Sequence, residues 1–158
     1  MEALTAGEIG VKSKAIYIWN REMAGKQKSR CPINLSLELV GDRWTLLILR
    51  DMVFGGKRHF REFLQSGEGI SSRTLAERLQ TLQDEGIVTR HEDPTHKLKA
   101  VYRLTAAGID LLPVLVALGT WGNRHRDADP ALAVHAEALA AGGPEAIAQM
   151  QAQLAARP

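Results

Sequence analysis

The 158-residue sequence has little of what marks secreted and membrane proteins. It contains one cysteine, Cys31, so no intramolecular disulfide framework can form, and a lone thiol suits a reducing compartment. No apolar run is expected to approach the roughly 20 residues that a membrane-spanning helix needs. Residues 1–14 carry no apolar stretch of the signal-peptide kind. We therefore expect a cytoplasmic protein without a membrane partner.

The sequence also lacks the motifs of common catalytic and metal sites. It shows no nucleophile with a matched base, no Gly-x-x-x-x-Gly-Lys-Ser/Thr phosphate loop and no evident pair of catalytic carboxylates. The five histidines lack the close spacing of metal ligands, and no cysteine pair accompanies them. We expect neither an enzyme nor a metal or cofactor site.

Bulk charge is nearly balanced. The formal net charge is +2, and a content of 45% hydrophobic and 24% charged residues is that of a globular chain with one core. Residues 1–30 hold six basic and three acidic side chains, residues 31–126 hold 13 and 11, and residues 127–158 hold one and four. A surface for nucleic acid must therefore come from the local arrangement of side chains.

The expected architecture is mostly α-helical with a small antiparallel hairpin. We divide the chain into an N-terminal extension (1–30), a core domain (31–126) and an alanine-rich helical tail (127–158). Helical spacing is expected at 8–24, before a basic linker at 25–30. Further helices are expected at 32–40, 43–54, 59–65 and 72–85, then strands at 87–92 and 100–105 around a turn at 93–97, and a long helix at 105–125. Pro113 should kink that last helix, and a Gly-Gly-Pro break at 142–144 should interrupt the tail, in which one or two weak helices are expected.

Capping residues mark several helix starts. Pro32 suits the first position of a helix. Asp42, Ser71 and Thr105 each stand directly before an expected helix, where a side-chain oxygen can accept a hydrogen bond from a first-turn amide. The segment 43–54 is apolar nearly all round, which predicts a buried central helix.

The segment 72–85 has the pattern of a DNA recognition helix. Leu75, Leu79 and Leu82 follow the i, i+4, i+7 spacing and make one narrow apolar stripe. Such a stripe anchors the helix and leaves its other face free for the major groove. The predicted DNA contacts on and beside that face are Ser71, Ser72, Arg73, Thr74, Glu77, Arg78, Gln80 and Thr81.

The N-terminal half of this helix is predicted to contact the bases. Its free amides and the helix dipole favour a phosphate at that end. Arg73 can donate two hydrogen bonds to a guanine edge, and Gln80 can pair with adenine. Glu77 and Asp84 would repel phosphates, which leaves the N-terminal half as the end that reads DNA.

The predicted hairpin adds a second DNA contact. His96, Lys97 and Lys99 lie at or just after its tip, where a wing touches phosphates or the minor groove. Taken alone, these charges are better explained as a solvated turn, because charged turns are common. Combined with the expected helices at 59–65 and 72–85, these charges favour a winged helix-turn-helix.

Several motifs within residues 31–126 resemble the HxlR-type family of bacterial winged helix-turn-helix regulators, which is related to the MarR group. The motifs are Cys31-Pro32, Gly41–Arg50, Phe60–Phe63, Gly69–Ser71, Leu75–Leu79, Asp84–Val88, Tyr102–Thr105, Pro113–Leu115 and Trp121-Gly122. The resemblance implies a homodimer, formed through the N- and C-terminal helices, that binds a palindromic operator in double-stranded DNA. We expect the dimer face to include Ile109, Leu112, Val116 and Leu118.

Cys31 has two interpretations. Some members of this family sense electrophiles or oxidants through a cysteine that matches it, and a helix N-terminus with Lys28 and Arg30 nearby would stabilise a thiolate. The alternative is a buried structural thiol. We favour the structural interpretation, because reactivity depends on exposure and no second cysteine is present.

The two tryptophans Trp44 and Trp121 have two interpretations, and so does the partner of the domain. Trp44 and Trp121 could line a pocket for a small-molecule effector, but aromatic residues on such helices more often belong to the core. The domain could also be a protein-interaction module that has lost DNA binding. A gel shift with mixed genomic fragments separates the module from a DNA-binding regulator, because only the regulator shows a specificity ratio.

Overall fold

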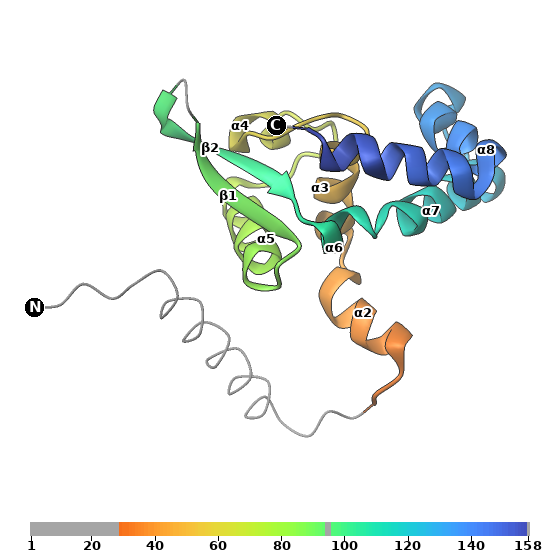
Figure 1. Cartoon of the computed structure of the whole chain (residues 1–158), viewed down its shortest axis with the longest axis horizontal. Coiled ribbons are helices and arrows are strands. Elements are labelled where there is room, and N and C mark those ends of the chain that lie inside the picture. Colours follow the sequence, from red (N-terminus) through yellow and green to blue (C-terminus); the bar gives the residue numbers. More distant parts are fainter. Residues whose placement is uncertain (1–28, 94–95, 158) are drawn as a thin grey trace, which may run out of the picture. The chain divides into compact units, whose positions relative to one another are not determined.

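A computed structural model of the chain describes residues 29–93 and 96–157, with only the backbone at 96–98 (Figure 1). The chain divides into two compact units, residues 1–38 and 39–158, and each is described by itself. The helix predicted at 8–24 and most of the basic linker, including Lys28, lie outside the described residues.

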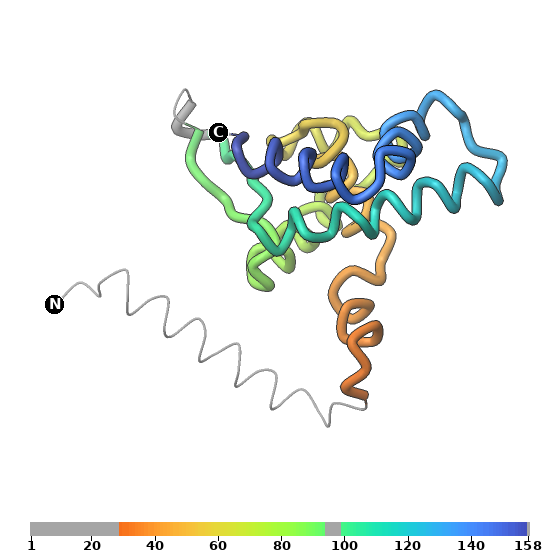
Figure 2. Tube along the Cα trace, turned by 45° about the vertical axis from the view of Figure 1, so that its right-hand side comes forward, coloured from red at the N-terminus to blue at the C-terminus, as the bar shows by residue number. Residues whose placement is uncertain are grey.

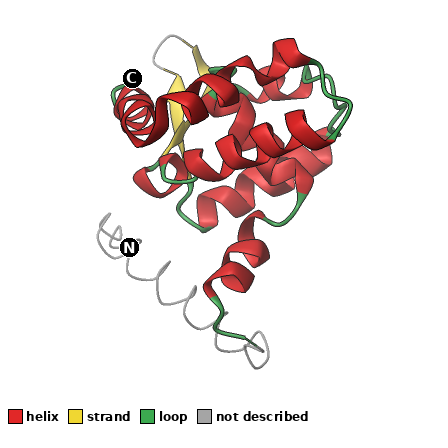
Figure 3. Ribbon diagram, turned by 90° about the vertical axis from the view of Figure 1, so that its right-hand side faces the viewer, coloured by secondary structure: helices red, strands yellow, loops and turns green. Residues whose placement is uncertain are grey.

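The described elements confirm a mostly helical fold with a two-stranded antiparallel hairpin (Figure 3). In chain order they are α2 (Pro32–Val40), α3 (Arg43–Val53), α4 (Phe60–Leu64), α5 (Ser72–Asp84), β1 (Val88–Asp93), β2 (His96–Leu104), α6 (Ala106–Ile109), α7 (Leu112–His125) and α8 (Pro130–Ala155).

The predicted caps are present. Asp42, Ser71 and Thr105 each accept a hydrogen bond from a first-turn amide of α3, α5 and α6, at 3.0, 3.1 and 3.2 Å. Gly86 has a φ of +69°, and this left-handed conformation directly after α5 suits glycine. Local chemistry therefore fixes where these helices begin and where α5 ends.

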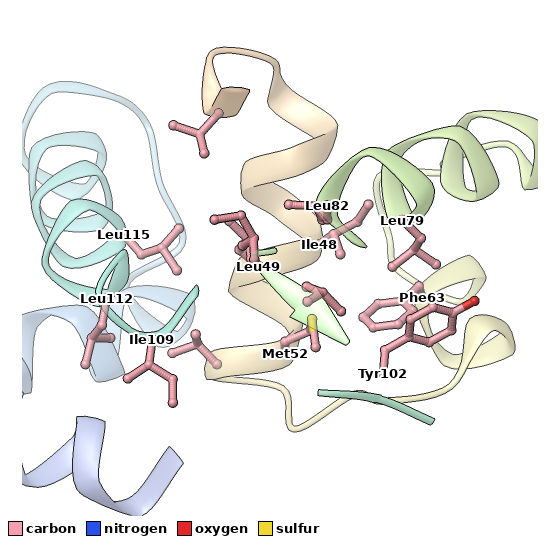
Figure 4. Packing of buried hydrophobic residues seen from close by; sticks show 14 of the residues in the cluster. Ile48, Leu49, Met52, Phe63, Leu79, Leu82, Tyr102, Ile109, Leu112 and Leu115 are labelled. Carbon is pink, nitrogen blue, oxygen red and sulfur yellow. The ribbon is translucent and has the colours of Figure 1, made fainter. Parts of the chain in front are cut away.

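Helix α3 lies at the centre of the core, as predicted. Figure 4 shows Leu49 of α3 with Leu79 and Leu82 of α5 on one side, and with Leu112 and Leu115 of α7 on the other. Four of these five side chains have exposed fractions of 1% or less, and Leu115 has 7%. Helix α5 and the C-terminal helices are thus held on one central helix.

The hairpin is longer than predicted. Its strands pair in register from Val88 opposite Leu104 to Glu92 opposite Ala100, and an irregularity follows before Asp93 pairs with His96. Because Asp93 and His96 belong to the strands, the predicted turn at 93–97 is too long.

The long helix predicted at 105–125 is two helices. Helix α6 ends at Ile109, and α7 begins at Leu112 with Pro113 in its first turn. Proline lacks the amide hydrogen that a helix interior needs, but it fits a first turn, where that amide would have no helical partner. Pro113 therefore follows a break between two helices, where the sequence predicted one kinked helix.

The tail forms α8, which runs back along α7 (Figures 1 and 2). Its interior is interrupted at the predicted break, where Gly143 has a φ of +66° and a ψ of −158° beside Pro144. Ala133, Ala136 and Leu154 of α8 are buried in the same unit as α7.

This packing overturns part of the predicted dimer face. Ile109, Leu112 and Val116 have exposed fractions of 7%, 0% and 5%, so they belong to the core of their own chain. Only Leu118 of the predicted set is exposed, at 48%. Long-range packing against α3 and α8, which a helical pattern cannot show, accounts for the error.

The expectation that no apolar run is long enough to span a membrane does not hold for residues 106–125. By length and composition this stretch could cross a membrane, with a mean hydropathy of 1.2, so the expectation of no such run is wrong here. A third of the stretch (33%) is buried inside the chain. Leu112, Leu115 and Val116 are core residues, which accounts for much of its apolar character.

Candidate DNA-binding interface

The short helix α4 is fixed from its N-terminal side. The carboxylate of Glu62 accepts hydrogen bonds from the amides of Arg58 and His59 at 2.7 and 2.8 Å. Burial alone would raise the pKa of Glu62, but these two hydrogen bonds outweigh it, and the pKa is lowered. Glu62 is therefore ionised at neutral pH and stabilises the first turn of α4.

Helix α5 has the predicted two-faced character. Leu75, Leu79 and Leu82 have exposed fractions of 0%, 1% and 0%, so the apolar stripe is confirmed as the anchor. The residues of α5 that are exposed are Ser72, Arg73, Ala76, Glu77, Gln80 and Asp84. A polar face of this kind, opposite a buried stripe, is what a major-groove helix requires.

Two ion or hydrogen-bond pairs lie along the exposed face of α5. The Nε of Arg73 donates to Glu77 at 2.9 Å, and Gln80 donates to Asp84 at 2.9 Å. The hydrogen bond to Glu77 raises the pKa of Arg73. A guanidinium has five N–H donors, so the bond from Nε leaves others to reach a base edge. Glu77 is thus placed to orient Arg73.

Two predicted DNA contacts also have partners inside the chain. Arg78 approaches the carboxylate of Asp42 to 3.3 Å, which joins α5 to the N-terminus of α3. This contact is an ion pair without hydrogen-bond geometry. Thr81 donates its hydroxyl to the backbone oxygen of Glu77 at 3.0 Å. Their role toward DNA remains a prediction.

The N-terminal turn of α5 is closed by a small hydroxyl cluster. Ser71 caps the helix through the amide of Thr74, and the hydroxyls of these two residues lie 2.8 Å apart. Ser72 is exposed beside them. The cluster fixes the turn at which a DNA phosphate would meet the helix dipole.

The hairpin is attached to the α3–α4 loop. The amide of Tyr102 donates to the backbone oxygen of Arg58 at 2.8 Å, and Nδ1 of His59 lies 3.1 Å from the oxygen of Ala100. Lys99 is exposed on β2. His96 and Lys97 lie on the same strand, but their side chains are outside the described residues. The wing is therefore tied to the helix-turn-helix at its base.

Residues 39–130 match the family described as HxlR-like helix-turn-helix. The chain belongs to this family. It is 41% identical over 93 residues to Rv3095 of Mycobacterium tuberculosis, an uncharacterised HTH-type transcriptional regulator, which covers 59% of this chain and 58% of the relative. The chain thus spans less than two thirds of that relative's length. The relatives are transcriptional regulators and not enzymes, which confirms the expectation from sequence.

Two solved structures carry the same fold. The crystal structure of PA1607, a proposed transcription factor, has a TM-score of 0.59 and 35% identity over 65% of this chain and 70% of its own. The oxidised form of the redox regulator HypR has a TM-score of 0.55 and 31% identity over 62% of this chain and all of its own. The winged helix-turn-helix predicted from the sequence is confirmed.

The HxlR-like domain contains an ionic network that sequence reasoning missed. The carboxylate of Asp51, with a side-chain exposed fraction of 8%, lies 2.6 Å from Arg50 and 2.9 Å from Lys57, and accepts a hydrogen bond from Ser66. Arg50 also donates two hydrogen bonds to Glu68, at 2.5 and 3.1 Å. The network ties α3 to the turn that leads into α5.

Arg50, Asp51 and Glu68 of this network are ionised at neutral pH. The hydrogen bond from Arg50 lowers the pKa of Glu68 to about 2, although burial opposes the shift. Burial would raise the pKa of Asp51, but its hydrogen bonds from Ser66, Lys57 and Arg50 together lower it. The bond to Glu68 in turn raises the pKa of Arg50, against the effect of burial.

A cleft of about 910 Å³ opens beside this network. It lies among α3, the α4–α5 turn, α7 and α8, and the network residues line one part of it. Leu46, Leu115 and Leu118 are among its apolar lining residues, and neither Trp44 nor Trp121 is. Among the described residues, no group of three or more His, Cys, Asp or Glu side chains is placed to hold a metal ion.

An exposed apolar row runs along α7. Val114, Leu118 and Trp121 follow the i, i+4, i+7 spacing and have exposed fractions of 41%, 48% and 53%. The expectation that Trp121 belongs to the core is therefore wrong, whereas Trp44 is partly buried and packs against the core.

Proposed function

We propose that this HxlR-like protein is a cytoplasmic homodimer that binds a palindromic operator in double-stranded DNA and thereby regulates transcription. The observation that carries the proposal is the division of α5 into a fully buried leucine stripe and an exposed polar face that begins with Arg73. Arg73 would contact base edges, and Lys99 of the wing would contact phosphates.

The apolar row on α7 supports the homodimer. Val114, Leu118 and Trp121 are large apolar side chains on one helical face, and such contiguous exposure on a small domain marks an interaction site. In the first unit, Ile33 and Leu37 of α2 are likewise exposed, at 71% and 58%, one helical turn apart. A two-fold pairing of such faces would present two copies of α5 to half-sites about 34 Å apart.

The experiment is a binding assay after operator selection from genomic fragments at fixed salt. Arg73→Ala should weaken binding to the selected operator by about 10- to 100-fold and relax its specificity. Lys99→Ala should weaken all sequences alike and flatten the salt dependence. The matched control is Arg126→Ala, an exposed arginine at the C-terminal end of α7. A wild-type protein that selects no sequence would instead support the protein-interaction module.

The cleft supports control by a small-molecule effector. Its volume of about 910 Å³ lies within the roughly 300–1,000 Å³ of pockets for drug-sized ligands. Its lining combines leucine and alanine side chains with the charged groups of the ionic network, which suits an apolar ligand that has one polar end. An effector bound there would contact the turn that precedes α5. It would also contact α7, which carries the apolar row proposed for the dimer. A ligand that raises the unfolding temperature and releases the operator would support this role.

Cys31 supports control by oxidants. The thiol is free and exposed, so the burial that a structural role requires is not met. Its backbone oxygen accepts the amide of Leu35 at 3.0 Å, which places the thiol directly before the first turn of α2. The similarity to the redox regulator HypR points the same way. We therefore include Cys31 in the proposal as a redox sensor.

A further inference from the structure

A second, smaller pocket lies where the end of α8 meets the base of the wing. It has a volume of about 260 Å³ and is lined from α3, the α3–α4 loop, both strands and the last residues of α8. Figures 1 and 2 both show the C-terminal end of α8 beside the hairpin. The volume is below the range for drug-sized ligands, so any occupant is small.

The charge of this pocket is of one sign. Lys57, Arg58, Arg103 and Arg157 are among its lining residues, and no aspartate or glutamate is. The ammonium of Lys57 is already bound to Asp51 and Ser66 at 2.9 and 2.7 Å. Arg58 also has an interaction inside the chain, so we attribute the positive charge offered to a ligand to Arg103 and Arg157.

Arg103 carries an unmet hydrogen-bond requirement. Its Nε is buried and has no hydrogen-bond partner among the described residues. A buried donor without a partner costs free energy, and a partner would be an acceptor that enters the pocket. Thr89 lies opposite Arg103 in the register of the hairpin and also lines the pocket, but its hydroxyl already donates to the backbone oxygen of Arg103 at 3.5 Å and lies 2.9 Å from Nε2 of His91.

Arg157 is held in place from the opposite wall. Its Nη1 donates to the backbone oxygens of Met52 and Val53, each at 3.3 Å, at the C-terminal end of α3. These bonds fix the guanidinium at the pocket while they use only one of its nitrogens. Two guanidinium groups, one from the wing and one from the C-terminal segment, thus line the same small space.

We propose that this pocket binds a small phosphate-bearing anion between Arg103 of the wing and Arg157 of the C-terminal segment. A guanidinium matches the geometry of phosphate, and a surplus of positive charge favours a dianion over a monoanion. Arg103 lies within the family match at residues 39–130 and Arg157 lies beyond it, so the site combines the family domain with the C-terminal segment. The proposal is independent of DNA binding.

The test uses the full chain without DNA and inorganic phosphate as the probe. Phosphate should raise the unfolding temperature saturably above the effect of chloride at equal ionic strength, because a ligand of the folded state stabilises it. Isothermal titration should show one site per chain. Arg103→Gln and Arg157→Gln should each weaken phosphate binding by about tenfold or more, since each removes a charge-assisted hydrogen bond. Arg126→Gln, at an exposed arginine outside the pocket, should bind phosphate like the wild type.

Circular dichroism of the unliganded variants checks that they fold. If Arg103→Gln does not fold, Arg103→Lys, which keeps the charge, takes its place. Arg103→Lys should bind phosphate more weakly than the wild type. The proposal is overturned if phosphate stabilises the protein no more than chloride does. It is also overturned if the pocket variants bind phosphate as the wild type does. A flatter salt dependence of DNA binding in Arg103→Gln, with no binding of free phosphate, would assign Arg103 to the DNA backbone and overturn it as well.

Discussion

Replacement of Asp51 by asparagine tests how the scaffold holds the recognition helix. Asparagine has nearly the same size but cannot carry the charge that Arg50 and Lys57 share. The side chain of Asp51 is 8% exposed, so water cannot take the place of the lost carboxylate. The variant would leave two cations beside a neutral amide in a partly buried site, with only Glu68 to balance them.

The expected cost is about 2–3 kcal/mol of unfolding free energy. Removal of one partner from a fully buried ion pair costs about 3–5 kcal/mol. The partners here have side-chain exposed fractions of 36% (Arg50) and 26% (Lys57), so solvent recovers part of that amount. The loss is large against the roughly 5–15 kcal/mol by which domains are stable.

Urea unfolding at pH 7 measures the loss, and Glu68→Gln is the matched control. The carboxylate of Glu68 is 29% exposed and Arg50 is its ion-pair partner, so its neutralisation should cost about 1 kcal/mol. A free energy of unfolding for Asp51→Asn within about 0.5 kcal/mol of the wild type would refute the argument, because surface substitutions fall in that range.

The same network predicts an acid dependence. The pKa values of Asp51 and Glu68 are both lower in the folded chain than in the unfolded one, and that of Glu68 falls from 4.5 to about 2. A lowered carboxyl pKa contributes stability that is present above the unfolded value and is lost as pH falls toward the folded value. The wild type should therefore lose stability between about pH 5 and pH 2, and Asp51→Asn should lose less over that window.

The core, the dimer row and the thiol each give one further prediction. Leu79→Ala should lower the unfolding free energy by about 2–5 kcal/mol in urea, because it opens a cavity beneath α5, and a loss below about 1 kcal/mol would contradict the buried stripe. Leu118→Glu should convert the dimer to a monomer in sedimentation, whereas Val134→Glu on the exposed side of α8 should not; a dimeric Leu118→Glu protein would exclude the α7 row as the interface. Diamide should release the wild type from its operator but not Cys31→Ser, and an equal response of both would remove the sensor role.

The elements that the sequence predicted well are those fixed by neighbours along the chain. Capping by Asp42, Ser71 and Thr105 depends on residues within three positions, so the helix starts could be placed to within a residue. The stripe of α5 repeats with the helical period, and its burial followed from that period alone. The candidate face around Arg73 could be located for the same reason.

The parts that could not be predicted depend on residues far apart in sequence. Arg50 and Glu68 are 18 positions apart, and each alone has the composition of an ordinary surface residue. The bond from His59 to Ala100 spans 41 positions, and the contact of Arg157 with Met52 spans 105. No local period relates such pairs, so the network, the attachment of the wing and the pocket beside the end of α8 became visible only with the fold.

The error over the dimer face has a geometric cause that also locates the proposed interface. Successive residues of a helix are about 100° apart, so Leu118 lies about 200° from Val116, on nearly the opposite face. Helix α7 therefore carries two apolar faces, and a set that joined Val116 to Leu118 mixed them. Leu112 and Val116 are buried in the core of their own chain, where both α3 and α8 contact α7, and the row of Val114, Leu118 and Trp121 is exposed. A helix that is apolar on two faces needs two partners: helices α3 and α8 of its own chain cover the first face, and a second copy of the chain is the partner we propose for the other.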